Sequence, residues 1–289
     1  MLYNKKRTKD CASSGSASIS DKTSTRGFVL TWAKTFNEKN TINSTDQNEL
    51  SLSSSSSNDF NNDFDGYKWV NFNGQKNLAT LNLIKGNVVY NEKLILIDKE
   101  EYRLWDPFRS KLAAALIKGL RNLPIKNKTK VLYLGASTGT TVSHISDIIG
   151  NSGVIFAIES SIRVARELIE NVASKRENII PIIEDARKPL SYFSTYGEVD
   201  VVYCDIAQPD QTEIAINNCK IFLKDGGKIL LVVKTRSIDV TQDPKTIILQ
   251  EAHKLENSGF NIEQIIYLDP YDKDNGLVFA TYTAYQINS

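Results

Sequence analysis

Several features are scarce or missing in this 289-residue sequence, and each absence excludes a class of protein. The three cysteines, Cys11, Cys204 and Cys219, show no paired spacing, which argues against disulfides and a zinc site and suits a reducing compartment. We therefore expect no metal. No apolar run approaches the roughly 20 residues of a membrane span, so no membrane partner is expected. The basic cluster at residues 5–9 has no apolar stretch behind it, so it is not a secretory signal; a nuclear address and an organelle transit peptide both stay open.

Net charge is also almost absent, because 35 basic and 34 acidic residues give +1. The charges are nevertheless segregated along the chain. Residues 41–66 contain acids and no Lys or Arg, whereas residues 100–130 are mainly basic. The basic segment is either a solvated helix face or a surface that meets phosphates.

Residues 1–66 are poor in apolar side chains and rich in Ser, Thr, Asn and Asp. Such a segment cannot offset the roughly 1–2 kcal/mol per residue that backbone ordering costs, so we expect disorder. Short β-type runs then follow, separated by turn residues. They are residues 67–72, 79–83, 87–90 and 94–97. These runs predict a small antiparallel β subdomain over residues 67–100, packed on a domain formed by residues 101–289.

The second domain alternates β-type and helical segments. Strands are expected at residues 131–134, 154–158, 179–183, 200–204 and 228–233, and helices from Asp106-Pro107, near Thr141, and at 161–173, 209–222 and 244–255. Near-continuous apolar strands separated by helices predict a parallel sheet covered on both faces. Two final β runs, residues 260–268 and 278–285, predict an antiparallel edge hairpin.

The first strand of this domain ends in a glycine-bearing loop that contains Gly135 and Gly139. The loop is neither the Gly-x-Gly-x-x-Gly dinucleotide fingerprint nor a Walker A loop. Glycines there allow a ligand to approach the backbone, and free N–H groups at a helix start near Thr140 and Thr141 suit a polar part of that ligand. S-adenosylmethionine is the obvious candidate, and a glycine turn without a ligand is the alternative.

In an open α/β sheet, ligands bind beyond the carboxyl ends of the strands. Glu159 ends the second strand and can accept hydrogen bonds from ribose hydroxyls. Asp185 and Ala186 follow the third strand, where a carboxylate can accept from an adenine amino group and a small side chain clears the ring. Asp205 ends the fourth strand and Lys234 the fifth. As alternatives, Glu159 or Asp205 caps a helix and Lys234 is simply solvated.

Asp205 and Lys234 together suggest methyl transfer to an oxygen. A sulfonium methyl donor carries its own driving force, so the protein must position the acceptor and remove its proton. For a ribose 2′-hydroxyl, a lysine that gives up its proton in a partly buried site can act as base, oriented by a carboxylate and a second lysine. Lys111, Asp205 and Lys234 fit these roles. The sequence after the fourth strand, residues 205–208, is not the Asp/Asn-Pro-Pro-aromatic pattern of amino-group methylation.

Longer strings resemble one family, fibrillarin: residues 101–115, 132–146, 181–187 and 205–211. The resemblance covers roughly residues 67–285. It implies an α/β, seven-stranded S-adenosylmethionine-dependent methyltransferase (Rossmann-like) fold behind a small N-terminal antiparallel β subdomain. The implied activity is 2′-O-ribose methylation of rRNA at sites selected by box C/D guide RNA. The implied partners are the guide RNA, a Nop-family scaffold protein and a kink-turn-binding protein, and the implied location is the nucleolus in the nucleus.

The resemblance also implies the site residues. The cofactor contacts would be Gly135, Thr140, Thr141, Glu159, Ser160, Asp185, Ala186, Asp205, Ile206, Ala207 and Gln208. The catalytic residues would be Lys111, Asp205 and Lys234, with Asp269 as a candidate fourth member.

The chain departs from the family pattern at several positions. Ser160 stands where an aromatic residue is common, Asp269 where Glu is usual, and Asn275 where His is expected. The tail is Ser/Asn/Asp-rich and not Gly/Arg-rich. Two other functions stay open: a protein glutamine methyltransferase acting on a histone, and a catalytically weak scaffold subunit, against which the retention of the two lysines and Asp205 argues.

Overall fold

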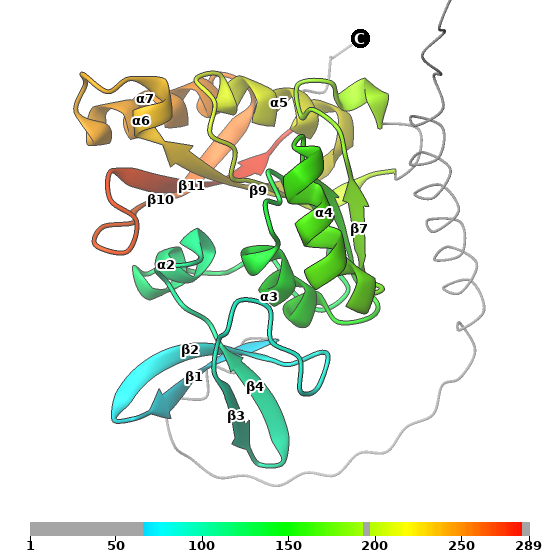
Figure 1. Ribbon diagram of the computed structural model, residues 1–289. Coiled ribbons are helices and arrows are strands. Elements are labelled where there is room, and N and C mark those ends of the chain that lie inside the picture. Colours follow the sequence, from blue (N-terminus) through cyan, green and yellow to red (C-terminus); the bar gives the residue numbers. More distant parts are fainter. Residues whose placement is uncertain (1–65, 193–196, 285–289) are drawn as a thin grey trace, which may run out of the picture.

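The computed structural model describes residues 66–192 and 197–284, which form two β-sheets with helices (Figure 1). The expected disordered tail lies outside the described residues except for Gly66, as does the end of the last predicted β run. No helix in the described part of the chain is long and apolar enough to cross a membrane.

The larger sheet has seven strands in the order β10-β11-β9-β8-β5-β6-β7. Its strands are β5 (Lys130–Leu134), β6 (Val154–Ile158), β7 (Ile179–Ile182), β8 (Val199–Cys204), β9 (Leu223–Lys234), β10 (Phe260–Tyr267) and β11 (Asn275–Tyr282). The strands β5 to β9 pair in parallel, and β11 is antiparallel to both β9 and β10. The predicted methyltransferase sheet is confirmed, and the final hairpin forms its edge with β11 inserted beside β9.

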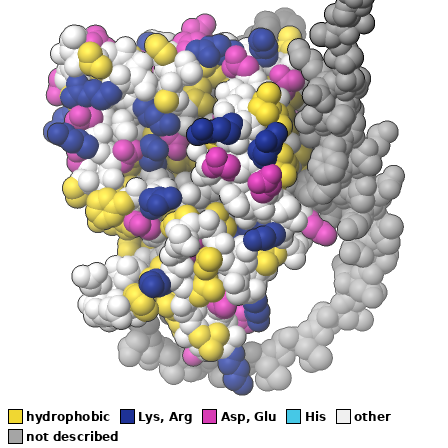
Figure 2. All heavy atoms as spheres, viewed as in Figure 1, with side chains coloured by type: hydrophobic (Ala, Val, Ile, Leu, Met, Phe, Trp, Pro, Cys, Tyr) yellow, Lys and Arg dark blue, Asp and Glu magenta, His cyan; other side chains and the backbone are white. Residues whose placement is uncertain are grey.

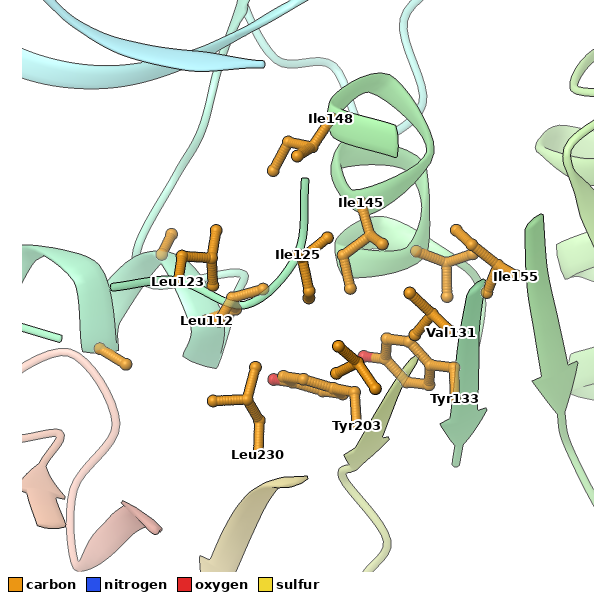
Figure 3. Packing of buried hydrophobic residues seen from close by; sticks show 14 of the residues in the cluster. Leu112, Leu123, Ile125, Val131, Tyr133, Ile145, Ile148, Ile155, Tyr203 and Leu230 are labelled. Atoms are coloured by element: carbon orange, nitrogen blue, oxygen red, sulfur yellow. The ribbon is translucent and has the colours of Figure 1, made fainter. Parts of the chain in front are cut away.

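Helices cover both faces of this sheet. The described helices are α2 (Lys111–Ile117), α3 (Thr140–Ile149), α4 (Ile162–Asn171), α5 (Gln211–Phe222), α6 (Thr235–Ile238) and α7 (Pro244–Glu256), with short 3-10 turns η1 (Ala173–Lys175) and η2 (Pro189–Ser191). Side chains alternate along each strand. On β5, Val131 and Tyr133 pack with α2, α3 and α4, whereas Leu132 and Leu134 pack on the side of α5 and α7. Figure 3 shows the first of these two layers.

The helix predicted to open at Asp106-Pro107 begins later, at Lys111. The Asp106 carboxylate accepts from the Phe108 backbone N–H at 2.8 Å, which closes a turn instead. Ser110 then caps α2 by accepting from the backbone N–H of Ala113. The turn therefore lies directly before the helix that carries Lys111.

The smaller sheet is antiparallel, in the order β1-β2-β4-β3. Its strands are β1 (Tyr67–Phe72), β2 (Gln75–Leu81), β3 (Leu94–Ile97) and β4 (Glu100–Leu104). The run predicted at residues 87–90 is not a strand, because the backbone N–H groups of Val89 and Tyr90 donate to the Glu92 carboxylate. The strand β4 takes its place, so the predicted boundary at residue 100 is wrong and this sheet extends to Leu104.

A buried ionic network joins the small sheet to the rest of the chain. The Asp147 carboxylate on α3 lies 2.8 Å from Arg103 of β4 and 2.6 Å from Arg176, which follows η1. Arg103 also pairs with Glu92 at 2.6 Å. All three side chains that meet at Asp147 are fully buried. Figure 1 shows the small sheet beside α2 and α3, which is the side where this network lies.

His144 lies within the same junction and is neutral. Thr80 donates its hydroxyl proton to Asp147 at 2.8 Å, so its oxygen accepts from Nδ1 of His144, also at 2.8 Å. The Tyr90 hydroxyl lies 2.7 Å from Nε2. Burial, together with the charges of Arg103 and Arg176, lowers the pKa of His144 well below the ordinary histidine value.

The basic segment is not one solvated helix face. Arg103 is buried in the network, and Lys111 is half-buried in the cluster described below. The other bases of this segment are exposed, and most follow α2, which ends at Ile117. Figure 2 shows basic and acidic side chains mixed over the face in view, without a large area of one sign.

Candidate active site

A cleft of about 290 Å³ opens beyond the carboxyl ends of β5, β6, β7, β8 and β9. Its lining residues are Gly135, Ser137, Ile158, Glu159, Ser160, Glu184, Asp185, Ala186, Arg187, Asp205, Ile206, Ala207, Gln208, Ile214 and Lys234. The lining combines carboxylates with apolar side chains, which is the combination that a nucleoside with a hydroxylated sugar and a flat base requires. These residues come together because the carboxyl ends of the parallel strands all lie at one edge of the sheet.

Gly135 is required by the protein's own packing at the mouth of β5. Its φ is +82°, and a Cβ there would lie 2.7 Å from the carbonyl oxygen of Asp205. The sequence predicted that glycine makes room for a ligand. The structure shows that Gly135 first makes room for the end of β8, which brings Asp205 next to the loop.

Glu159 is held beside the glycine loop by two backbone groups. Its carboxylate accepts from the N–H of Ser137 at 3.0 Å and from the N–H of Ser161 at 2.9 Å. The bond from Ser161 is a contact at the start of α4, as the helix-cap alternative predicts. The bond from Ser137 links the same carboxylate to the glycine loop. Glu159 therefore lines the cleft in a fixed orientation with acceptor capacity left for a ligand hydroxyl.

Asp185 and Ala186 also line the cleft, after β7, which is the neighbour of β6 in the sheet. The Asp185 carboxylate accepts from the N–H of Arg187 at 2.9 Å, and the Ala186 carbonyl accepts from Asn218 at 2.8 Å. Arg187 reaches across to Asp210 at 2.8 Å and to Gln208 at 2.8 Å. These bonds connect two predicted cofactor segments, so the wall is built as one unit.

Asp205 lies between the two lysines that the sequence singled out. Its carboxylate is 2.8 Å from Nζ of Lys234 and 3.3 Å from Nζ of Lys111. Lys234 also donates to the backbone carbonyl of Asp205 at 2.9 Å. The side chain of Asp205 is 12% exposed and those of the lysines 25% and 21%, so water and a substrate can still reach the cluster.

Gln211, at the start of α5, holds the end of β9 in place. Its side chain accepts from the backbone N–H of Lys234 at 3.0 Å and donates to the carbonyls of Gln208 and Lys234 at 3.1 and 3.3 Å. Gln211 is fully buried. No sequence signal assigned this role, because a glutamine at a helix start shows no partner 23 residues away until the chain is folded.

Thr140 and Thr141, which the resemblance placed at the cofactor, do not line the cleft. Thr140 is the first residue of α3. Thr141 is buried and donates its hydroxyl to Ser110 at 3.0 Å. Ser110 is the N-cap of α2, so Thr141 positions the helix that begins with Lys111.

Asp269 is exposed and makes no hydrogen bond or ion pair with the lysines or Asp205 in the described part of the chain. Instead, the structure brings Asp272 to Lys111, with Oδ2 at 3.8 Å from Nζ. The loop after β10 turns at Leu268, whose carbonyl accepts from the N–H of Asp272, and this places Asp272 inward. In this structure the aspartate next to Lys111 is thus Asp272, and a catalytic role for Asp269 stays a prediction. Asn275 lies opposite Lys234 in the pairing of β11 with β9.

The tyrosine, cysteine and histidine side chains of the structure are poor candidates for a catalytic base at this cluster. Burial, with the charge of Asp205 in the same direction, raises the pKa of Tyr203 and Tyr133 well above the ordinary tyrosine value. Burial raises the pKa of Cys204 to about 12. Of the two histidines, His144 is in the junction and His253 is exposed on α7. The tyrosines, Cys204 and the two histidines are therefore unsuited to accept a proton at this cluster.

No group of three or more His, Cys, Asp or Glu in residues 66–192 and 197–284 is arranged to hold a metal ion. A family model does match the chain. The fibrillarin model covers residues 60–284.

The chain belongs to the fibrillarin family.

Relatives and solved structures agree with this assignment. A fibrillarin-like rRNA/tRNA 2′-O-methyltransferase from Saccharolobus islandicus is 56% identical over 209 residues, which are 72% of this chain and 90% of the relative. Fibrillarin from Aeropyrum pernix, solved with natively bound S-adenosyl-L-methionine, is 42% identical, with a TM-score of 0.70 over 80% of this chain and 100% of that one. A fibrillarin/Nop5p complex gives 39% identity and a TM-score of 0.66 over 75% of this chain and 97% of that chain.

Proposed function

We propose that this fibrillarin-family protein methylates ribose 2′-hydroxyl groups of rRNA, with S-adenosylmethionine as methyl donor and box C/D guide RNA selecting the sites. The observation that carries the proposal is the carboxylate of Asp205 between Lys234 and Lys111, at the end of a nucleoside-sized cleft. The family match and the 2′-O-methyltransferase name of a relative that is 56% identical support the reaction type.

The cleft suits the proposed cofactor. Glu159 offers carboxylate oxygens to ribose hydroxyls, Asp185 offers one to an amino group of the base, and Ala186 leaves space for a flat ring. When bound, S-adenosylmethionine supplies an activated methyl group on sulfur. Gly135, Ile206, Ala207 and Gln208 complete the wall next to Asp205. For Thr140 and Thr141, the proposal is an indirect role through α3 and Ser110.

We assign the base to Lys234, because it lines the cleft whereas Lys111 does not. Lys234 would take the proton of the 2′-hydroxyl at Nζ, and bound S-adenosylmethionine would supply the methyl group to that oxygen, its sulfonium leaving as a thioether. Asp205 orients Lys234 and offsets the charge that it gains. Lys111 holds the other carboxylate oxygen, and Asp272 lies 3.8 Å from the Nζ of Lys111.

The assembly is proposed from the relatives. The fibrillarin/Nop5p complex supports a Nop-family scaffold as partner. Guide RNA, an rRNA substrate and a kink-turn-binding protein would complete the particle. Net charge of +1 and the mixed charges in Figure 2 give little general attraction for RNA, which suits a subunit that is delivered to its substrate by a particle. Residence in the nucleus and nucleolus stays a prediction, which localisation of the tagged protein in its own cells would test.

The test is methyl transfer from labelled S-adenosylmethionine to a guide-matched RNA in a reconstituted particle. Wild type is compared with Lys234→Ala and Asp205→Ala. We expect incorporation at one 2′-hydroxyl, reduced about 10²-fold or more in both variants. Glu256→Ala, an exposed carboxylate on α7, serves as the control and should match wild type.

Incorporation that the two variants leave undiminished would remove the catalytic assignment. Incorporation by the protein alone into a histone glutamine would favour the protein methyltransferase instead. No transfer by wild type under any condition would favour the scaffold function, and the departures at Ser160 and Asn275 would then be the first positions to restore.

A further inference from the structure

Two aromatic rings from segments that also carry Lys111 and Asp272 pack against each other. Phe108 and Tyr271 have ring centroids 5.2 Å apart at an interplanar angle of 67°. They come from two distant segments, the turn before α2 and the loop between β10 and β11. Figure 1 shows this loop beside α2.

Phe108 is exposed to an unusual degree for its type. Its side chain is 67% exposed, and it is the only aromatic residue among the exposed large hydrophobic side chains of residues 66–192 and 197–284. A phenylalanine normally gains free energy by burial, so a ring that the fold holds outward calls for an external contact. Tyr271, by contrast, packs partly on the core and supports the ring of Phe108 from the side.

Phe108 and Tyr271 lie in the same short segments as two charged residues of the cluster, Lys111 and Asp272. The Asp106 carboxylate fixes the Phe108 backbone N–H at 2.8 Å, and Ser110 caps the helix that begins at Lys111. On the other segment, Tyr271 directly precedes Asp272, which lies 3.8 Å from Lys111. Each aromatic residue is therefore fixed by the same short segment that supplies a charged group to the cluster.

The substrate sets what such a pair can contact. If a guide pairs with the target, the target base is stacked inside an A-form duplex and its 2′-hydroxyl faces the wide, shallow minor groove. Sugars of the neighbouring nucleotides line that groove and present C–H faces. The exposed face of the Phe108 ring, supported edge-on by Tyr271, can pack on these sugars, whereas an ammonium group alone would contact only phosphates or hydroxyls.

We propose that Phe108 and Tyr271 contact the minor groove of the guide–target duplex. This contact positions the duplex so that one 2′-hydroxyl lies next to Lys234 and Asp205. This role rests on the proposed function. Phe108 is a positioning residue that fixes the distance between the acceptor oxygen and the methyl donor. Small displacements of a reacting atom cost about 10²-fold in rate, so loss of the ring acts mainly on kcat.

The first experiment compares Phe108→Ala, Phe108→Trp and Phe108→Leu in the reconstituted particle. We expect Phe108→Ala and Phe108→Leu to lower kcat by about 10- to 100-fold, while Phe108→Trp keeps most of it, because a flat ring is retained. The Phe108 variants should bind S-adenosylmethionine with wild-type affinity and should assemble into the particle as efficiently as wild type. Val240→Ala, which removes a side chain that is also 67% exposed, is the matched control and leaves the rate unchanged.

The second experiment places the photoreactive amino acid p-benzoylphenylalanine at position 108 and illuminates the loaded particle. Crosslinks to the guide or target RNA support the proposal. Crosslinks only to a protein subunit, failure of Phe108→Ala to enter the particle, or a rate of Phe108→Ala within about twofold of wild type would each overturn it. If wild type transfers no methyl group, the proposed function fails, and the crosslink still decides whether the aromatic pair contacts RNA.

Discussion

The molecule contains the same charged arrangement twice, in two different settings. At the junction with the small sheet, Asp147 lies between Arg103 and Arg176, and all three side chains are fully buried. At the end of the cleft, Asp205 lies between Lys111 and Lys234, and these side chains are 12–25% exposed. Both clusters place one carboxylate between two basic side chains that come from distant segments of the chain.

The difference lies in the chemistry of the bases. A guanidinium does not lose its proton in a protein, and its fork of donors satisfies several acceptors at once, which suits a buried joint. An ammonium can lose its proton and is compact, which suits a group that must accept a proton from a substrate. The buried cluster therefore holds the fold together, whereas the exposed one is available for chemistry.

The largest expected effect is at the buried carboxylate. Asp147→Ala leaves Arg176 without its carboxylate partner in a site with no water access, and we expect a loss of about 3–5 kcal/mol in the free energy of unfolding. Urea-induced unfolding measures it. Glu256→Ala removes an exposed pair with His253 and should cost about 1 kcal/mol or less. Similar losses in the two variants would show that the buried cluster has no special structural role.

The second prediction exchanges the type of base in the cleft. Lys234→Arg keeps the charge but cannot become neutral, so we expect methyl transfer in the particle to fall about 10²-fold or more. Lys111→Arg, where only the charge is needed, should lose less than about tenfold. Both variants should unfold at the urea concentration of wild type. If Lys111→Arg is the more damaging variant, the base is Lys111 and not Lys234.

The reverse exchange at the junction should affect stability and leave the chemistry intact. Arg103 donates separately to Glu92, Asp147 and Ser143, and a lysine cannot reach all three. We expect Arg103→Lys to lower the free energy of unfolding by about 1–3 kcal/mol. Methyl transfer, measured at a temperature where the variant is folded, should stay within about twofold of wild type. A loss as large as that of Lys234→Arg would mean that the two clusters are coupled.

The smallest effect concerns pH. Burial lowers the pKa of His144 in the folded chain, whereas the unfolded chain titrates near 6.5. Below that pH the unfolded state binds the extra proton, so the free energy of unfolding should fall by up to about 1.4 kcal/mol per pH unit as pH decreases. Urea unfolding between pH 7 and pH 5 measures the slope. His144→Gln should flatten it, and an unchanged slope would place its origin elsewhere.

Much of the fold could be predicted from local patterns. Apolar strands such as Val154–Ile158 alternate with helices, and this alternation is sufficient for a parallel sheet. The mistakes were local as well. Residues 87–90 have β-type composition, but the backbone N–H groups of Val89 and Tyr90 donate to the Glu92 carboxylate and not to a neighbouring strand. The helix at Asp106-Pro107 starts late because the aspartate closes a turn with Phe108.

The sequence determined which residues lie at one edge of the sheet. Glu159, Asp185, Asp205 and Lys234 each lie at or shortly after the carboxyl end of a parallel strand, and such ends meet at one edge of the sheet. Only the tertiary structure decided which aspartate approaches Lys111, that Thr141 acts through Ser110, and that Arg103 is buried. These contacts join positions far apart in the chain, and a sequence pattern carries no distance between them.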